Sequence, residues 1–422
     1  MTHQLLSPLR VIESSAFIAA PLAGLTLAQF GADVIRVDMI GGGIDYGRLP
    51  RLAGSQGAAA GRSLYWTGLN KGKRSIAIDL RRPEGRELVQ ALVTASGPDP
   101  MDSGVLLTNI GTPWLAHALL AERRPDLISC TIQGNGDGST ALDFTVHCAT
   151  GYPQVTGQAT PQAPINQVLP AWDIACAYQA AFAVVAAVDH RRRSGLGAAL
   201  QLALSDMAFC TLSHLGVLAE AELLGQQRPA LGNHIYGAFG RDFCCADGRR
   251  VMVAAISAGQ WQALVQACGA ADGMARLQAQ SGLDFADEGQ RYQGREAIAA
   301  LLEPWFAART QAEVAAQLDA HRVCWGNYQG PLEALAQDPR LSPANPVFER
   351  IDTPGVGPHL AAGSAVRLGG QPRNAVRPAP LLGADTEAVL ADVLGLSGAE
   401  VGRLHDAGIV AGADRDPTQP SV

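Results

Sequence analysis

Several signals that would assign a function at once are missing from this 422-residue chain. Its eight cysteines form no C-x-x-C pair, and their spacing fits no zinc framework. We therefore expect no metal site, and we expect most cysteines to be reduced and buried as small apolar residues. The net charge of −7 comes without a basic stripe, which argues against a general nucleic-acid binder.

Signs of export and of membrane insertion are also missing. The residues after Met1 do not form a basic region followed by an apolar run and a small-residue cleavage site. The most apolar stretch, Ala180 to Val188, has about half the length needed to span a bilayer. We expect a soluble, cytoplasmic protein with no membrane partner.

The chain does have an apolar content of 47%, enough for a sizeable core, and an opening that alternates strand and helix. Residues 9–13 and 33–38 are predicted strands, and the helix between them, 22–30, stops at Gly31. Such a unit predicts a parallel sheet with a ligand at the carboxyl ends of its strands. The turn at 14–21 lacks G-x-G-x-x-G, so the nicotinamide fingerprint is absent.

The same alternation continues along the chain and predicts the fold class. We expect α/β architecture, with a doubly wound, Rossmann-like large domain and a smaller α+β domain. The large domain is expected to cover 1–222 and to be completed by 345–422, with the small domain at 223–344. The polar tail from Gly412 to Val422 is expected to be frayed. Further strands are predicted at 75–80, 105–109, 127–132, 199–203 and 323–326, and helices at 86–94, 173–193 and 206–225.

Two features could carry chemistry. Asp173 follows Trp172 in an apolar setting at the start of a long alanine-rich helix. A carboxylate there can cap the helix by binding its free amides, or it can be a nucleophile. The segment Asn70 to Ser75 places three cations just before a strand, which suits a phosphate-bearing ligand but also an ordinary solvated loop.

Taken in order, several segments resemble the class III CoA-transferases over nearly the whole chain. They are PLAG at 21–24, FGADVIRVD at 30–38, NKGKRSI at 70–76, PEGR at 83–86, WD at 172–173, GN at 232–233 and APLLGADT at 379–386. Three more segments are similar to the branch of that family that moves CoA between the two carboxyl groups of one mesaconate. These are GGGIDY at 41–46, VLPAWDI at 168–174 and GNHIYGAFGRD at 232–242.

The resemblance implies a mechanism in which Asp173 is the nucleophile. The aspartate attacks the acyl-CoA thioester to give a mixed anhydride, and the CoA thiolate then makes an aspartyl-CoA thioester. The freed acid stays bound until its other carboxylate attacks that thioester. The helix N-terminus is expected to lower the pKa of Asp173 and keep it ionised. CoA would be part of the substrate, with no prosthetic group, and the family implies an interlocked homodimer.

The resemblance also implies binding residues, beginning with the loop 15–20, which would line the thioester site. Family transferases for oxalate and formate carry glutamine near the position of Ile18, and an apolar residue suits a methyl-branched acyl group. CoA contacts are expected at Ala19, Arg36, Lys71, Lys73, Arg74 and Asn109. Contacts to the free dicarboxylate are expected from Ile18, Arg48, His147, His234, Tyr236 and Arg241. Local packing and surface ion pairs are the alternative explanations for each.

Four other functions remain open at this stage. An acyl-CoA epimerase needs a histidine–aspartate pair, and Leu142 occupies the histidine position beside Asp143, although His147 is near in sequence. An intermolecular CoA-transferase would use the same Asp173. A nicotinamide oxidoreductase is disfavoured by the missing glycine fingerprint. A CoA-binding protein without catalysis would form no covalent adduct.

Overall fold

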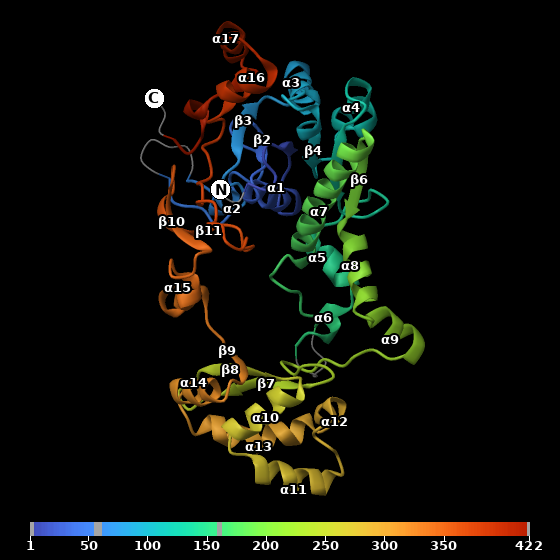
Figure 1. Cartoon of the computed structure of the whole chain (residues 1–422), viewed down its shortest axis with the longest axis vertical. Helices are drawn as coiled ribbons and strands as arrows, with labels where there is room; N and C mark the ends of the chain where they lie inside the picture. The colour runs from blue at the N-terminus through green and yellow to red at the C-terminus, as the bar shows by residue number, and fades with distance from the viewer. Residues whose placement is uncertain (1–3, 55–60, 158–162, 420–422) are drawn as a thin grey trace. The chain divides into compact units, whose positions relative to one another are not determined.

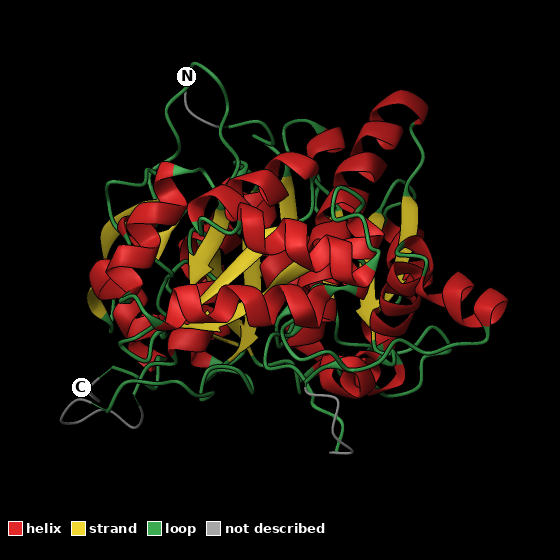
Figure 2. Ribbon diagram, turned by 90° about the horizontal axis from the view of Figure 1, so that it is seen from below, coloured by secondary structure: helices red, strands yellow, loops and turns green. Residues whose placement is uncertain are grey.

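The computed structural model of the protein describes residues 4–54, 61–157 and 163–419 (Figure 1). The chain forms two compact units, one made of 1–150, 167–219 and 339–422 and the other of 151–166 and 220–338. The predicted limits of independently folding domains stay a prediction, since compactness alone does not test them. Figure 2 shows the mixture of helices and strands expected of an α/β protein.

The described part of the larger unit is built on a seven-stranded sheet in the order β12-β3-β2-β1-β4-β5-β6. All pairs are parallel except β12 with β3. This is the doubly wound order, so the predicted fold class is confirmed. The strands are β1 Arg10–Ser14, β2 Asp33–Met39, β3 Arg74–Ile78, β4 Val105–Thr108, β5 Ile128–Gln133, β6 Ala198–Ala203 and β12 Val410–Ala411.

Helices cover both faces of this sheet because alternate strand residues are apolar on each face. On one face Ile12, Ile35 and Ile76 share a buried cluster with α3 Pro83–Thr94, α4 His117–Arg123, α16 Thr386–Leu394 and α17 Gly398–Asp406. The other face carries α1 Ala19–Gln29 and α7 Ala171–Ser194, which pack against each other. The larger unit also contains α2 Leu64–Leu69, α5 Asp143–Ala149, α8 Leu204–His214 and the antiparallel pair β10 Phe348–Thr353 and β11 Gly357–Ala362.

The smaller unit is α+β, as predicted, with a three-stranded antiparallel sheet among its described residues. Its core is aromatic, and the rings of Phe243 and Phe306 stack at 4.2 Å between centroids. The strands are β7 Phe239–Cys244, β8 Arg250–Ala255 and β9 Cys324–Asn327. The helices are α6 Tyr152–Val155, α10 Ala258–Ala267, α11 Ala271–Ser281, α12 Glu288–Gln293, α13 Arg295–Ala307, α14 Gln311–Ala320 and α15 Pro331–Gln337.

Two predictions about the chain's course are wrong. The helix expected at 206–225 is two helices, α8 and α9 Val217–Leu224, separated by Gly216 with a φ of +73°. The tail after Gly412 is ordered at least to residue 419, because buried Asp416 accepts hydrogen bonds from Tyr46 and from the amide of Leu382. Residues 420–422 lie outside the described residues.

The prediction that most cysteines are buried is also wrong. Cys148, Cys210, Cys244 and Cys324 are exposed, and the other four are buried. The exposed ones lie on the outward sides of helices α5 and α8 and of strands β7 and β9. Whether a cysteine is buried depends on the face of the helix or strand on which it lies. The spacing of cysteines along the sequence does not reveal that face.

Helix α7 is long and apolar enough to pass a length-and-composition test for a membrane span. The helix packs against α1, α8, β5 and β6, and its buried residues include Cys176, Ala180 and Val184. The core helices of soluble proteins pass the same test, and 44% of the most apolar window of α7 is buried by this packing.

Candidate active site

A cavity of about 190 Å³ lies at the carboxyl edge of the seven-stranded sheet. Its lining includes Ile18 after β1, Asn109 after β4, Gln133 at the end of β5 and Leu204 after β6. The order of the strands reverses between β1 and β4, which is where doubly wound sheets bind ligands. The walls are largely apolar, and the charged groups that face the cavity are Arg48, Asp143 and Asp173.

Asp173 lines this cavity from the first turn of α7 without capping the helix. The carboxylate that binds the free amides is that of Asp143, whose Oδ2 accepts hydrogen bonds from the amides of Trp172 at 2.6 Å and Asp173 at 3.0 Å. Among the described residues, none donates a hydrogen bond to the Asp173 carboxylate. The helix cap is therefore supplied by another helix, and the half-buried side chain of Asp173 is left facing the cavity.

The electrostatics of Asp173 are the reverse of the expected ones. Burial, and after it the nearby Asp143 carboxylate, raise the pKa of Asp173 to about 7, although Arg48 acts in the opposite direction. The predicted lowering by the helix N-terminus is wrong because Asp143 already occupies the amides that would have stabilised the anion. A half-buried carboxylate with a pKa near neutrality is the kind of perturbed group found at functional sites, and carboxylates can serve as nucleophiles in covalent catalysis.

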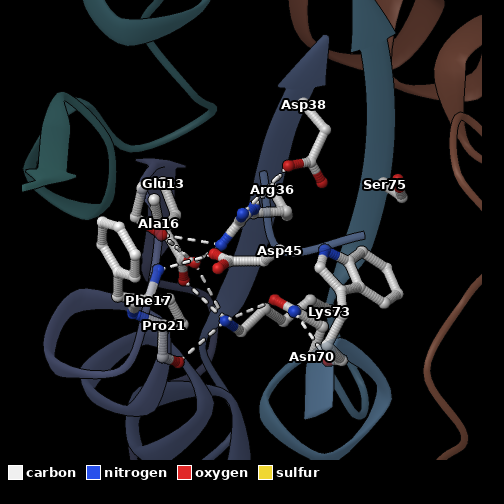
Figure 3. Close-up of polar contacts among 12 residues, drawn as sticks. Glu13, Ala16, Phe17, Pro21, Arg36, Asp38, Asp45, Asn70, Lys73 and Ser75 are labelled. Atoms are coloured by element: carbon white, nitrogen blue, oxygen red, sulfur yellow. Dashed lines mark hydrogen bonds and ion pairs between the residues drawn. The ribbon is translucent and has the colours of Figure 1, made fainter. Parts of the chain in front are cut away.

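The loop before α1 is held in a strained conformation beside the cavity. Phe17 has a φ of +63°, in the left-handed region that non-glycine residues rarely occupy. Its amide donates to Asp45 Oδ2 at 2.6 Å, as Figure 3 shows. Asn109 exchanges two hydrogen bonds with the backbone of Ala16, at 2.8 and 2.6 Å. These bonds fix the backbone that places Ile18 and Ala19 at the cavity. The amide of Asn109 is thus engaged internally, and its contact with CoA stays a prediction.

Arg48 is the cation that lines the cavity. Its guanidinium lies 5.0 Å from the centroid of the Phe17 ring and 4.6 Å from that of Tyr65. The nearest carboxylate is Asp45 at 3.6 Å, and the Arg48 side chain keeps 38% of its exposure. Stacking on two rings orients the guanidinium while leaving hydrogen-bond donors for an incoming carboxylate.

A buried ion network lies under α1 and connects three neighbouring strands (Figure 3). Glu13 on β1 pairs with Arg36 on β2 at 2.9 Å and with Lys73, next to β3, at 2.8 Å. The Lys73 ammonium also donates to the carbonyl of Pro21 and to Asn70. Arg36 and Lys73 were predicted to contact CoA. Both side chains are almost fully buried and engaged with protein groups, so that role stays a prediction.

Gly24 in α1 makes room for this network. A Cβ at Gly24 would lie 1.7 Å from Oε2 of Glu13, so alanine there must displace a buried carboxylate. We predict that Gly24→Ala lowers the free energy of unfolding by about 3 kcal/mol, since overpacking and disturbed ion pairs act together. Denaturant unfolding measures the change. Gly68→Ala is the control, because Gly68 is helical, exposed and has open space around it. Equal stability of the two variants would contradict the packing argument.

The remaining cations of the 70–75 segment lie away from this cavity. Arg74 begins β3 and pairs with Asp33 at 2.6 Å. Lys71 precedes the strand and donates to the carbonyl of Ala362 at 2.8 Å. Both residues stand at the amino ends of the parallel strands, whereas the cavity lies at the carboxyl ends. The structure does not bring them together with Asp173.

The other predicted substrate contacts do not line this cavity. His147 is buried, accepts a hydrogen bond from Trp172 Nε1 at 3.2 Å, and has a pKa lowered by burial. Tyr236 and Arg241 belong to the smaller unit, where the Tyr236 hydroxyl donates to Glu220 at 2.7 Å. Arg241 lines another cavity there, of about 610 Å³, together with His234 and residues of β7 and α13. Their contacts with a dicarboxylate stay a prediction.

Sequence reasoning missed the two carboxylates that organise the site, Asp143 and Asp45. Asp143 was noted as the neighbour of Leu142, and Asp45 lies in the GGGIDY segment, but neither was assigned a role. Asp143 begins α5, a helix that the sequence analysis did not predict, so no local pattern pointed to this residue. In the described part of the chain, no group of three or more His, Cys, Asp and Glu side chains could hold a metal ion.

Comparisons with known proteins show which family this chain resembles over nearly its whole length. The family model "CoA-transferase family III" matches residues 6–386. The chain is 48% identical to 2-methylfumaryl-CoA isomerase from Chloroflexus aurantiacus, over 97% of this chain and 99% of that protein. It is 28% identical to succinyl-CoA:mesaconate CoA-transferase from Haloarcula marismortui, over 86% of this chain and 90% of that protein.

Other relatives are more distant. Formyl-CoA:oxalate CoA-transferase from Rhodopseudomonas palustris is 27% identical, over 96% of this chain and 97% of that protein. A solved structure of a CaiB/BaiF family protein from Brucella suis superposes with a TM-score of 0.74 at 25% identity, covering 92% of this chain and 99% of that one. With a family model and a close relative that both span nearly its whole length, the chain belongs to CoA-transferase family III.

Proposed function

We propose that this protein is an isomerase that moves CoA within one molecule, converting 2-methylfumaryl-CoA (mesaconyl-C1-CoA) into 3-methylfumaryl-CoA (mesaconyl-C4-CoA). The observation that carries the mechanism is the position of Asp173, half-buried in an apolar cavity with its pKa raised to about 7. The choice of substrate rests on the 48% identity to 2-methylfumaryl-CoA isomerase.

The reaction needs no external donor, acceptor or oxidant. Asp173 attacks the C-1 thioester carbonyl, forming a mixed anhydride and releasing the CoA thiolate. The thiolate attacks the aspartyl carbonyl, which gives an aspartyl-CoA thioester and a free dicarboxylate. The C-4 carboxylate then attacks that thioester and forms a second anhydride, and the thiolate returns to the C-4 carbonyl. Asp173 leaves as a carboxylate, so atoms and charges balance.

Retention of the free dicarboxylate distinguishes this reaction from exchange with solution. Arg48 supports retention because its guanidinium, oriented by Phe17 and Tyr65, faces the cavity with donors to spare. Ile18, Ile132 and Phe144 offer apolar contact to a methyl-branched carbon chain. Holding the acid in place replaces a second encounter with a high effective concentration. CoA takes part as substrate and carrier, and we expect a cytoplasmic homodimer.

An intermolecular CoA-transferase is the competing proposal, since relatives with that printed activity share the family. The test is turnover of C1-linked mesaconyl-CoA in excess isotopically labelled free mesaconate, with products resolved by mass. Intramolecular transfer gives unlabelled C4-linked product. Label in the product would mean that the acid exchanges with solution, and the isomerase proposal would fall.

The raised pKa of Asp173 predicts a pH dependence of kcat/KM. The nucleophile is the ionised form, so activity should rise with pH through about 7, whereas an ordinary aspartate would be ionised well below that. Asp143→Asn removes a like charge, so the rising limb should move to lower pH. Asp189→Asn makes the same change of charge at an exposed site on α7 and should leave the limb in place. If the rising limb of Asp143→Asn stayed at the same pH, the charge of Asp143 would have no influence on the ionisation of Asp173.

A further inference from the structure

The larger unit has a second cavity, of about 280 Å³, at the other end of α1. The active-site cavity touches Ile18 and Ala19 at the start of this helix, and the second cavity touches Ala28 and Gln29 at its end. Nine residues of α-helix span about 14 Å, so the two cavities are separated by roughly that distance along α1. The second cavity is at the amino edge of the sheet, opposite the acyl site.

Three cations line this cavity, and none of its lining residues is an aspartate or glutamate. Lys71 donates to the Ala362 carbonyl at 2.8 Å, and Arg373 donates to the carbonyls of Ser364 and Val366. Arg377 lies over Gly72, with Nε 3.5 Å from where a Cβ of that glycine would be. Within the described chain, no carboxylate forms an ion pair with Lys71, Arg373 or Arg377.

Neighbouring cations of the larger unit, unlike these three, are paired with carboxylates. Arg74, three residues after Lys71, is neutralised by Asp33, and Lys73 by Glu13. At Lys71 burial lowers the pKa, and no neighbouring carboxylate offsets that effect. Lys71 and Arg373 are half-buried and Arg377 is exposed, and cations gathered without a counter-ion repel one another, which a bound anion would relieve.

The backbone holds the cations in place by joining two distant parts of the chain. The amide of Gly72 donates to the Pro378 carbonyl at 3.1 Å, which fixes the loop of Lys71 against the segment of Arg377. Gly363 donates to the Val347 carbonyl at 2.8 Å and anchors the neighbouring wall to β10. The three cations are therefore brought together by the backbone of the folded unit and not by the conformation of a single side chain.

We propose that this cavity is a second ligand site, which binds a phosphoryl group of a small molecule independently of the acyl site. Two guanidinium groups and one ammonium match the geometry and the multiple charge of a phosphate or diphosphate better than a single carboxylate. Free phosphate compounds and the phosphates of CoA itself share this chemistry. The site is assigned here to the former, because it lies at the sheet edge opposite the one that carries Asp173.

The probe is inorganic pyrophosphate, titrated calorimetrically into the full-length protein with and without saturating CoA. We expect saturable binding that weakens about tenfold or more in Arg377→Ala and in Lys71→Met, since each loses a charge-assisted contact. Arg367→Ala is the matched control, because Arg367 is an exposed arginine of the same segment that does not line the cavity. Asp173→Asn should bind pyrophosphate as the unmodified protein does.

Three results would overturn the proposal. They are the absence of binding by the unmodified protein, equal weakening in Arg367→Ala and Arg377→Ala, and displacement of pyrophosphate by CoA. Displacement would place the CoA phosphates in this cavity without affecting the assignment of Asp173. Because Arg377 is exposed, Arg377→Ala tests the site even if Lys71→Met disturbs the contact with Ala362.

Discussion

Replacing Asp173 with asparagine should lower kcat by about 10⁴-fold or more, since the amide cannot form the anhydride or the enzyme thioester. The chain should stay folded, because no described residue donates a hydrogen bond to the Asp173 side chain and the cap of α7 comes from Asp143. Steady-state turnover of 2-methylfumaryl-CoA measures the loss, and CoA binding by calorimetry should change little.

Stability measurements separate a lost nucleophile from a damaged fold. An acid whose pKa is raised by folding destabilises the native state once pH exceeds its unfolded value. At pH 8 Asp173→Asn should therefore unfold at a higher temperature than the unmodified protein, and the difference should disappear below pH about 4. Near-normal turnover in the variant would contradict the role of Asp173 as the nucleophile. A lower unfolding temperature at pH 8 would contradict the raised pKa of its carboxyl group.

Lys73→Met should lower the free energy of unfolding by about 3–5 kcal/mol, the usual cost of leaving a buried charge unpaired. Glu13, at 0% exposure, would lose its ammonium partner at 2.8 Å and keep only Arg36 as a counter-ion. The Pro21 carbonyl would also lose a hydrogen bond, and it lies in the helix that starts at the candidate active site. Burial lowers the pKa of Lys73 to about 8 despite Glu13, so the Lys73 ammonium is still charged at pH 7.

A second variant tests whether the unpaired charge causes the loss. The double variant Glu13→Gln, Lys73→Met should recover part of the stability, because no uncompensated carboxylate remains. Arg81→Met, which removes a cation from the exposed pair with Asp79, should leave stability unchanged. If the double variant were less stable than Lys73→Met, the unpaired Glu13 carboxylate would not be the cause of the lost stability.

Periodicity predicted strands β1 to β6 and helices α1, α3 and α7 of the large unit because their apolar patterns are strong, and it missed the shorter helices α2, α4 and α5. The predicted strand 33–38 and β2 Asp33–Met39 differ by one residue at one end, and the predicted strand 127–132 and β5 Ile128–Gln133 differ by one residue at each end. The predicted 22–30 helix begins earlier, at Ala19, because the small residues before Leu22 are buried against the sheet. Local pattern is a good guide where a face is fully buried.

Contacts between distant segments could not be predicted in this way. The tail after Gly412 is polar and was expected to fray, but Asp416 is buried by bonds to Tyr46 and Leu382. Asp173 was expected to be stabilised as an anion by the amides of its own helix, and Asp143 takes them instead. Both errors have one cause, a hydrogen-bond partner more than 25 residues away that the local sequence does not reveal.

The resemblance to class III CoA-transferases predicted more residues of the candidate site than the local sequence pattern did. It pointed to Asp173, Ile18, Ala19, Arg48 and Asn109, all of which line one cavity. It also grouped Lys71 and Arg74 with them, and these lie at the opposite edge of the sheet. These cations were placed just before a predicted strand, at its amino end, whereas parallel sheets bind ligands at the carboxyl ends, so the predicted strand already disagreed with this grouping.

The most direct test of the central claim is to identify the covalent adduct. The protein would be incubated with 2-methylfumaryl-CoA, treated with hydroxylamine or left untreated, digested and examined by peptide mass spectrometry. We expect CoA on the peptide that contains Asp173, its conversion to a hydroxamate by hydroxylamine, and no adduct in Asp173→Asn. An active enzyme with no adduct there, or with one on another residue, would contradict the account.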